Sequence, residues 1–186
     1  MKKINIPKFF HELFGTEQYK FEVVLVFFFT IVSTFTVGYV TKDYWMDYNF
    51  LQVLVLLFLF IDIAGGVIAN LSKGTDLHYH NHKKGRMIFI AIHVQPLILS
   101  LVMASDMKIA IGVWAYTMVS VLIVNYLHKS EVQRTVAGTL LTTGLIGLYL
   151  LGSTLPKAIF IIYMMYLVKV IFSFGVYHRS SEVLNE

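Results

Sequence analysis

Six long apolar stretches constrain the fold more than any other feature of this sequence. They cover residues 21–40, 50–71, 87–104, 109–127, 136–155 and 158–176. A bilayer core of about 30 Å requires about 20 largely apolar residues of helix, so each stretch meets or approaches the length of a membrane span. The stretches are continuous rather than alternating, which is not the pattern of an outer-membrane strand. We therefore predict an all-α polytopic integral membrane bundle with six transmembrane helices and a short N-terminal interfacial helix.

The composition agrees with this prediction. Of the 186 residues, 57% are hydrophobic and 14% are charged, whereas soluble domains average about 25% charged residues. The gaps between the stretches are short, so we expect one membrane domain over residues 1–186. The absence of cysteine excludes disulfide bonds, thiolate ligands and cysteine catalysis. We expect the bilayer, and no nucleic acid, as the main partner.

Lysine and arginine are distributed unequally between the two sides of the predicted bundle. One side carries eleven of them, and the other carries only Lys42, Lys108 and Lys157. Cytoplasmic loops are enriched in Lys and Arg, so we predict a multi-pass protein of the cell membrane with the N-terminus and the tail 177–186 in the cytoplasm. The eleven are Lys2, Lys3, Lys8, Lys20, Lys73, Lys83, Lys84, Arg86, Lys129, Arg134 and Arg179.

The first 20 residues are expected to lie on the cytoplasmic leaflet. Pro7 is suited to the first turn of a short helix, and Gly15 can end that helix. Anchoring at the interface is the expected role, and docking of a partner helix is the alternative. The apolar side chains share one face and the polar ones the other: Phe9, Phe10, Leu13 and Phe14 against Lys8, His11 and Glu12.

The fifth span carries a stripe of small residues. Thr139, Thr143 and Gly147 recur at i, i+4 and i+8. Small residues let membrane helices approach closely. We predict that this stripe packs against another helix.

Asp62 is the first candidate for function. It lies nine residues from the cytoplasmic end of its span, which is about 14 Å deep at 1.5 Å per residue. An ionisable residue within a span costs roughly 2.5 to 3.5 kcal/mol on insertion scales and is a functional candidate by default. Asp62, Gly66 and Asn70 follow at i+4 spacing. We predict that this face points into the bundle and that Asp62 and Asn70 bind a substrate or ion.

Lys169 and His93 are the other candidates within the spans. Lys169 lies about 10 Å deep; it can pair with Asp62, extend to the cytoplasmic surface, or belong to a working proton or substrate site. His93 lies about 9 Å inside the third span, close to Pro96, which is expected to kink that helix. With Glu22 and Asn125, these polar groups occupy the midplane or the cytoplasmic half, so we predict a polar cavity open to the cytoplasm.

The loop over residues 74–86 places three histidines at alternate positions. His78, His80 and His82 are candidate ligands of zinc or iron, since zinc favours nitrogen and oxygen donors in sets of four. The basic residues Lys83, Lys84 and Arg86 repel a cation, and they also attract anionic lipid headgroups. Headgroup binding is the preferred interpretation, and a metal site, acid sensing and binding of an anionic substrate are the alternatives.

Three hypotheses for function remain open. In the leading one the chain is a transport or solute-binding protein, in which Asp62 binds a proton or cation, Lys169 balances that charge and His93 relays protons. In the second it is a metal-dependent enzyme acting on a lipid or amphipathic substrate. Its ligands are then the three loop histidines with His93. In the third it is an assembly or regulatory subunit, either a homo-oligomer or the partner of another membrane subunit. No HExxH, phosphate-loop or G-x-S-x-G motif is present, so enzyme activity stays undecided.

Overall fold

The computed structural model describes residues 2–128 and 130–178. The prediction of six apolar spans is confirmed: within the described residues, six helical segments are long and apolar enough to cross a membrane. The chain is a polytopic membrane protein. Lys129 and Arg179, two of the eleven Lys and Arg residues assigned to the cytoplasmic side, lie outside the described residues. So does the predicted tail from residue 179 onward. The spans are α2 (Lys20–Val40), α4 (Phe50–Leu71), α6 with α7 (Lys83–Ile92 and Gln95–Val102), α8 (Met107–Tyr126), α9 (Gln133–Leu151) and α10 with η2 (Lys157–Leu167 and Val168–Phe174).

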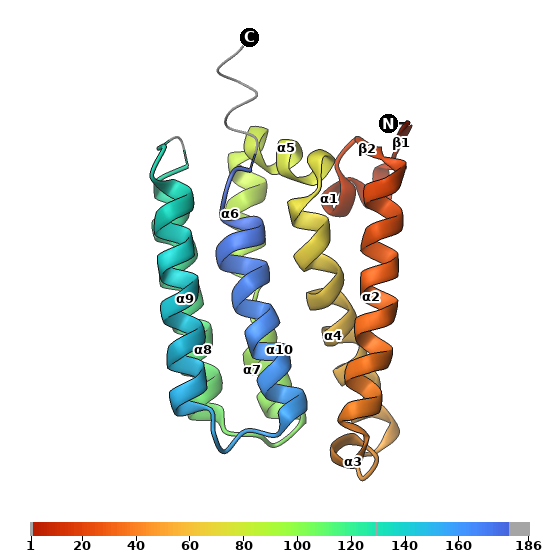
Figure 1. Ribbon diagram of the computed structural model, residues 1–186, viewed down its shortest axis with the longest axis vertical. Helices are drawn as coiled ribbons and strands as arrows, with labels where there is room; N and C mark the ends of the chain where they lie inside the picture. The colour runs from red at the N-terminus through yellow and green to blue at the C-terminus, as the bar shows by residue number, and fades with distance from the viewer. Residues whose placement is uncertain (1, 129, 179–186) are drawn as a thin grey trace.

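The long helices stand side by side (Figure 1). The N-terminal segment, α5 (Lys73–Asn81) and the last described residues lie at one end, called here the terminal end, and α3 (Lys42–Trp45) lies at the other, the opposite end. The last span and α4 each bury more residues than any other span, whereas α2 buries only Val26. The centre of the bundle is therefore formed by α4, α10 and η2.

Local capping sets two of the helix starts. The side chain of Asn49 accepts a hydrogen bond from the backbone of Gln52, and the Gln52 side chain bonds back to the Asn49 backbone, forming a capping box before α4. Asp106 accepts from the backbone N–H groups of Lys108 and Ile109 at the start of α8. Both caps lie at the opposite end of the bundle.

The third span is broken where the sequence predicts a kink. Helix α6 ends at Ile92 and α7 begins at Gln95, with His93 and Val94 between them in non-helical conformations. Pro96 has no N–H to bond to the carbonyl of Ile92, and its ring crowds the preceding turn. The predicted kink near His93 is confirmed as a full interruption of the helix.

The last span also departs from regular α-helix. It changes at Val168 into a π-helix, η2, that continues to Phe174. Such wider turns are rare and are frequent at functional sites. Lys169 is the second residue of this segment, so the change of geometry occurs at a candidate site residue.

The N-terminal segment contains the predicted short helix, divided into a 3-10 turn η1 (Lys8–Phe10) and α1 (His11–Phe14), with Gly15 at its C-terminal cap. Two short strands that the sequence does not predict, β1 (Lys3–Asn5) and β2 (Glu17–Tyr19), pair antiparallel around it. The side chain of Phe9 is 88% exposed. This is the arrangement expected of a segment that anchors in an interface, while its other side packs on α5.

The small-residue stripe of α9 does not pack within the described chain, so that prediction is wrong for intrachain contacts. Thr139 and Thr143 are exposed, and a Cβ added to Gly147 would meet nothing within 4 Å. The inward face carries Gly144 instead, where an added Cβ would lie 2.7 Å from the ring of Tyr116. The ring of Tyr116 packs where Gly144 has no side chain, and Thr143 and Gly147 line an open groove between α8 and α9 beside this contact.

Candidate functional site

An ion pair joins three elements in the middle of the bundle. Lys169 Nζ of η2 lies 2.8 Å from Asp62 Oδ2 of α4. Gln95, the first residue of α7, donates through Nε2 to the same oxygen at 3.1 Å. The Lys169 side chain is 3% exposed and that of Asp62 is 41% exposed. Of the alternatives for Lys169, the structure shows the pair with Asp62 and not extension to the surface.

Gly66 makes room for this pair. A Cβ at position 66 would lie 2.3 Å from Cε of Lys169 and 3.0 Å from its Nζ. Gly66 is one turn from Asp62, on the face that the i+4 spacing predicts to point inward. The lysine stem therefore crosses α4 over the glycine to reach the carboxylate.

Replacement of Gly66 by alanine is expected to displace Lys169 from Asp62 without changing any charge. The clash involves the flexible end of a side chain, so we expect the bundle to fold and the stability to fall by about 1 to 3 kcal/mol, as for other overpacked sites. Thermal unfolding in detergent measures this change. Gly112→Ala, in the span α8, is the matched control, because its Cβ would meet nothing within 4 Å. Equal stability of the two variants would contradict the assigned role of Gly66.

His93 is held rigidly at the break in the third span. Its ring stacks on Phe89 with centroids 3.8 Å apart, and Phe89 stacks on Phe174 at 3.6 Å. Its Nδ1 lies 2.5 Å from the carbonyl oxygen of Phe89. Because a carbonyl only accepts, Nδ1 carries the proton and Nε2 of the neutral ring is left as an acceptor.

Two tyrosines of α10 bond to backbone carbonyls at the break and just after it. The hydroxyl of Tyr166 donates to the carbonyl of His93 at 2.7 Å, and that of Tyr163 donates to the carbonyl of Pro96 at 3.2 Å. Both side chains are fully buried. The interruption is thus satisfied by the neighbouring helix, as non-helical backbone at membrane depth requires.

Several acceptor atoms around the ion pair have no donor. His93 Nε2 and Gln95 Oε1 are buried without a hydrogen-bond partner among the described residues. Gln95 and Lys169 both donate to Oδ2 of the Asp62 carboxylate. His93 also interacts electrostatically with both Lys169 and Asp62. These unpartnered atoms are hydrogen-bond acceptors, so they can bind a proton or a cation more favourably than an anion.

A second polar region, called here the terminal chamber, lies between α5, α6 and the turn after η2. It is a hollow of about 290 Å³ that is partly open to solvent. Arg86 organises it by donating through Nη1 to the carbonyl of His80 at 2.8 Å and to His128 Nε2 at 3.0 Å. Its polar and charged lining residues are Asn70, Thr75, Asp76, Tyr79, His80, Arg86, His128 and Tyr177.

Two histidines of the predicted loop, His78 and His80, lie on α5, and His82 follows the last residue of that helix. The three side chains do not converge on one point. His78 stacks on His82 with centroids 4.6 Å apart and lies 3.7 Å from the Glu12 carboxylate. His80 points elsewhere and stacks on Tyr177 at 3.8 Å in the terminal chamber. Burial lowers the pKa of His78, and Glu12 opposes that shift. In residues 2–128 and 130–178, no three His, Asp or Glu side chains are placed to hold a metal ion.

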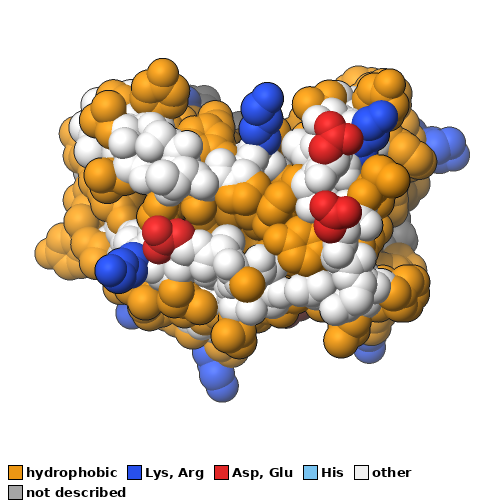
Figure 2. All heavy atoms as spheres, turned by 90° about the horizontal axis from the view of Figure 1, so that it is seen from below, with side chains coloured by type: hydrophobic (Ala, Val, Ile, Leu, Met, Phe, Trp, Pro, Cys, Tyr) orange, Lys and Arg blue, Asp and Glu red, His pale blue; other side chains and the backbone are white. Residues whose placement is uncertain are grey.

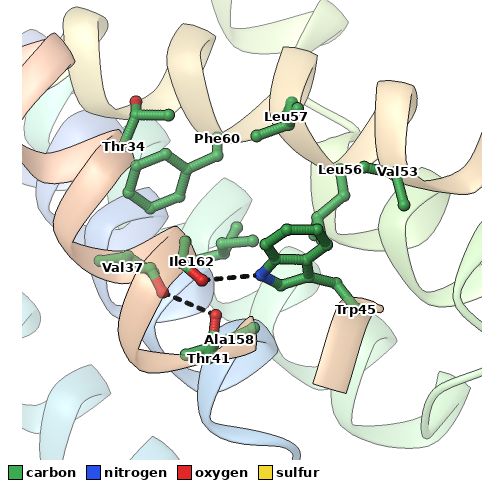
Figure 3. Close-up of a pocket in the computed structure, with 11 residues that line it drawn as sticks. Thr34, Val37, Thr41, Trp45, Val53, Leu56, Leu57, Phe60, Ala158 and Ile162 are labelled. Carbon is green, nitrogen blue, oxygen red and sulfur yellow. Dashed lines mark hydrogen bonds between the residues drawn. The ribbon is translucent and has the colours of Figure 1, made fainter. Parts of the chain in front are cut away.

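An apolar cavity of about 410 Å³ lies between α2, α4 and α10 towards the opposite end (Figure 3). Trp45 lines it and donates through Nε1 to the carbonyl of Gly38 at 2.8 Å, and Thr41 bonds back to the carbonyl of Val37. None of the predicted site residues lines this cavity. It is therefore separate from the ion pair and from the terminal chamber.

The sequence missed several residues of this site. Gln95 stands next to the proline that breaks the span, and this position was the only signal for it. The helical spacing of Tyr163, Tyr166 and Lys169 indicates a polar stripe on the last span, but it does not indicate that the two tyrosines reach the broken helix. Their roles depend on α10 facing α7, which only the tertiary structure shows.

Three unusual features meet in one place: a charge pair within the membrane spans, a broken helix and a π-helical turn. Discontinuous helices form the substrate and ion sites of many transporters, and ionisable residues at such depth mark proton and ion pathways. Comparison of the chain with models of protein families, with characterised proteins and with solved structures finds no match.

Proposed function

We propose that the chain is a proton- or cation-coupled transport or solute-binding protein, with Asp62 and Lys169 as its coupling pair. The observation that carries the proposal is the 2.8 Å contact between these side chains, made at the point where α4, the broken third span and η2 meet. Asp62 binds the proton or cation, Lys169 balances its charge, and His93 lies beside them.

The unequal burial of the pair supports the coupling role. Asp62 is 41% exposed, so its carboxylate is the more accessible of the two groups, whereas Lys169 is 3% exposed. Protonation of the carboxylate would leave a buried ammonium without its counter-charge, which is strongly unfavourable. Binding of a proton or cation at Asp62 therefore favours a different arrangement of η2 against α4. A ligand shifts a conformational equilibrium by the difference in its binding free energy between the two conformations.

The two ends of the molecule differ in charge. Figure 2 views the opposite end, where charged side chains are few and are separated by apolar and uncharged ones. The terminal end carries most of the basic residues, including Lys83 and Lys84 at the start of α6. By the positive-inside rule this supports a cytoplasmic terminal end, so the terminal chamber faces the cytoplasm.

Asp62→Asn tests the proposal. In proteoliposomes loaded with a pH-sensitive dye, the variant is expected to lose proton flux or its dependence on pH by about 5- to 150-fold, the usual range for removal of a coupling interaction. Asp47→Asn is the matched control, because it makes the same change at an exposed position between α3 and α4. Unchanged pH-dependent flux in the Asp62→Asn protein, with the wild-type chain active, would reject the proposal.

A further inference from the structure

Two nearly fully buried polar side chains lie on the terminal side of the ion pair. Asn70 is 5% exposed and Ser173 is 1% exposed. Asn70 Nδ2 and Ser173 Oγ are buried without hydrogen-bond partners in the described part of the chain. Buried polar groups in proteins are nearly always bonded to protein or to ordered water. These two atoms therefore point to a ligand that can both donate and accept.

Both side chains belong to the elements that hold the pair. Asn70 is two turns along α4 from Asp62, and Ser173 is four residues along η2 from Lys169. Asn70 also lines the terminal chamber. The two residues therefore lie between the ion pair and that chamber.

Between the pair and the opposite end, α4 and α10 contribute mainly hydrophobic side chains to the centre. Towards the opposite end, the residues of α4 and α10 nearest the centre are buried hydrophobic side chains, Leu59 and Ile162 among them. Tyr163 and Tyr166 donate their hydroxyls to backbone carbonyls. Within Phe50–Ile61 and Lys157–Leu167, every buried polar side-chain atom has a hydrogen-bond partner.

We infer that Asn70 and Ser173 hold a short file of water that connects Lys169 with the terminal chamber, and that this passage is closed towards the opposite end. Buried water typically makes about three hydrogen bonds to polar groups that are otherwise unsatisfied. The amide of Asn70, the hydroxyl of Ser173 and the ammonium of Lys169 supply such groups between the pair and the chamber. The role of the passage in coupling rests on the proposed function, whereas its existence does not.

Cysteine accessibility tests the passage directly. The chain contains no cysteine, so Ser173→Cys introduces the only thiol, and it does so with a nearly isosteric side chain. The reagent is aminoethyl methanethiosulfonate, applied to sealed vesicles of each orientation. Ser173→Cys is expected to react at least about tenfold faster from the terminal side than Ser120→Cys, a factor equivalent to ~1.4 kcal/mol. Ser120, on α8, is the matched control because it is also 1% exposed.

Two further variants protect the test against a folding failure. Asn70→Cys is expected to react from the terminal side as Ser173→Cys does. Leu59→Cys, on α4 beyond Asp62, is expected to react no faster than Ser120→Cys. The inference is overturned if neither Ser173→Cys nor Asn70→Cys exceeds the control, or if either reacts equally well from the opposite side.

The outcome separates this inference from the proposed function. Rapid labelling of Ser173→Cys together with unchanged flux in Asp62→Asn would retain the passage and reject coupling through Asp62. Slow labelling together with lost flux would retain the coupling pair and reject the passage.

Discussion

Asp62→Leu is expected to lower the free energy of unfolding by about 3 to 5 kcal/mol, the usual result of removing one partner from a buried pair. The substitution leaves the ammonium of Lys169, 3% exposed, without a counter-charge. Lys169→Met is expected to cost less, because the Asp62 carboxylate is 41% exposed and keeps its bond to Gln95. The double variant is expected to lose less free energy of unfolding than the two single variants lose together. Chemical unfolding in mixed micelles measures all three.

The surface pair Lys3–Glu17 provides a matched control cycle. Its atoms are 3.2 Å apart, but both side chains are 56% exposed. Exposed pairs typically contribute about 0 to 1 kcal/mol, so Lys3→Met and Glu17→Leu should show little coupling. If the Asp62 and Lys169 effects simply add, within about 0.5 kcal/mol, the two side chains do not stabilise each other and the asymmetry argued above is wrong.

Gly15→Ala is expected to release the N-terminal segment from α5. Gly15 has a φ of +69°, and an added Cβ would lie 2.2 Å from the carbonyl oxygen of Gly74. The left-handed conformation costs an alanine roughly 1 to 2 kcal/mol. The overlap with the Gly74 backbone adds to this cost, because backbone atoms cannot move aside by rotating a side-chain torsion. Two buried bonds depend on the docking: Gln18 Nε2 to Ser72 Oγ at 2.6 Å and Thr75 Oγ1 to the carbonyl of Leu13 at 2.7 Å.

Hydrogen exchange measures this release. The backbone N–H of Gly74 donates to Gln18 Oε1 at 3.2 Å, so its protection is expected to fall in Gly15→Ala while that of the spans is retained. Gly85→Ala is the control at the same end of the bundle, because its Cβ would meet its nearest neighbour at an ordinary 3.6 Å. Unchanged protection of Gly74 would show that the close approach of the two glycines is not needed for docking.

Sequence signals predicted the structure correctly where a residue constrains the backbone next to it. Pro96 predicts the break in the third span because a missing N–H and a crowding ring act on adjacent residues. Pro7 and Gly15 predict the short N-terminal helix for similar reasons. The hairpin that encloses that helix escaped prediction, because its strands are only three residues each and pair across the segment between them.

Signals that depend on the direction of a helix face were less reliable. The spacing of Asp62, Gly66 and Asn70 indicated an inward face, and the structure places Lys169 across Gly66. The spacing of Thr139, Thr143 and Gly147 is of the same kind, yet that face points out of the bundle. Three histidines close in sequence were candidate ligands of one metal ion, but His78 stacks on His82 whereas His80 stacks on Tyr177.

The sequence by itself determined the six spans, the break at Pro96 and the unequal distribution of basic residues between the two ends. Each of these follows from length, local backbone chemistry or composition. Only the tertiary structure decided which faces meet, and so which polar groups form the site. The physical reason is that lipid chains are as apolar as the side chains of the bundle interior, so no hydrophobic force distinguishes an inward face from an outward one. Packing at glycines and the pairing of a few polar groups, as at Gly66, Asp62 and Lys169, make that choice instead.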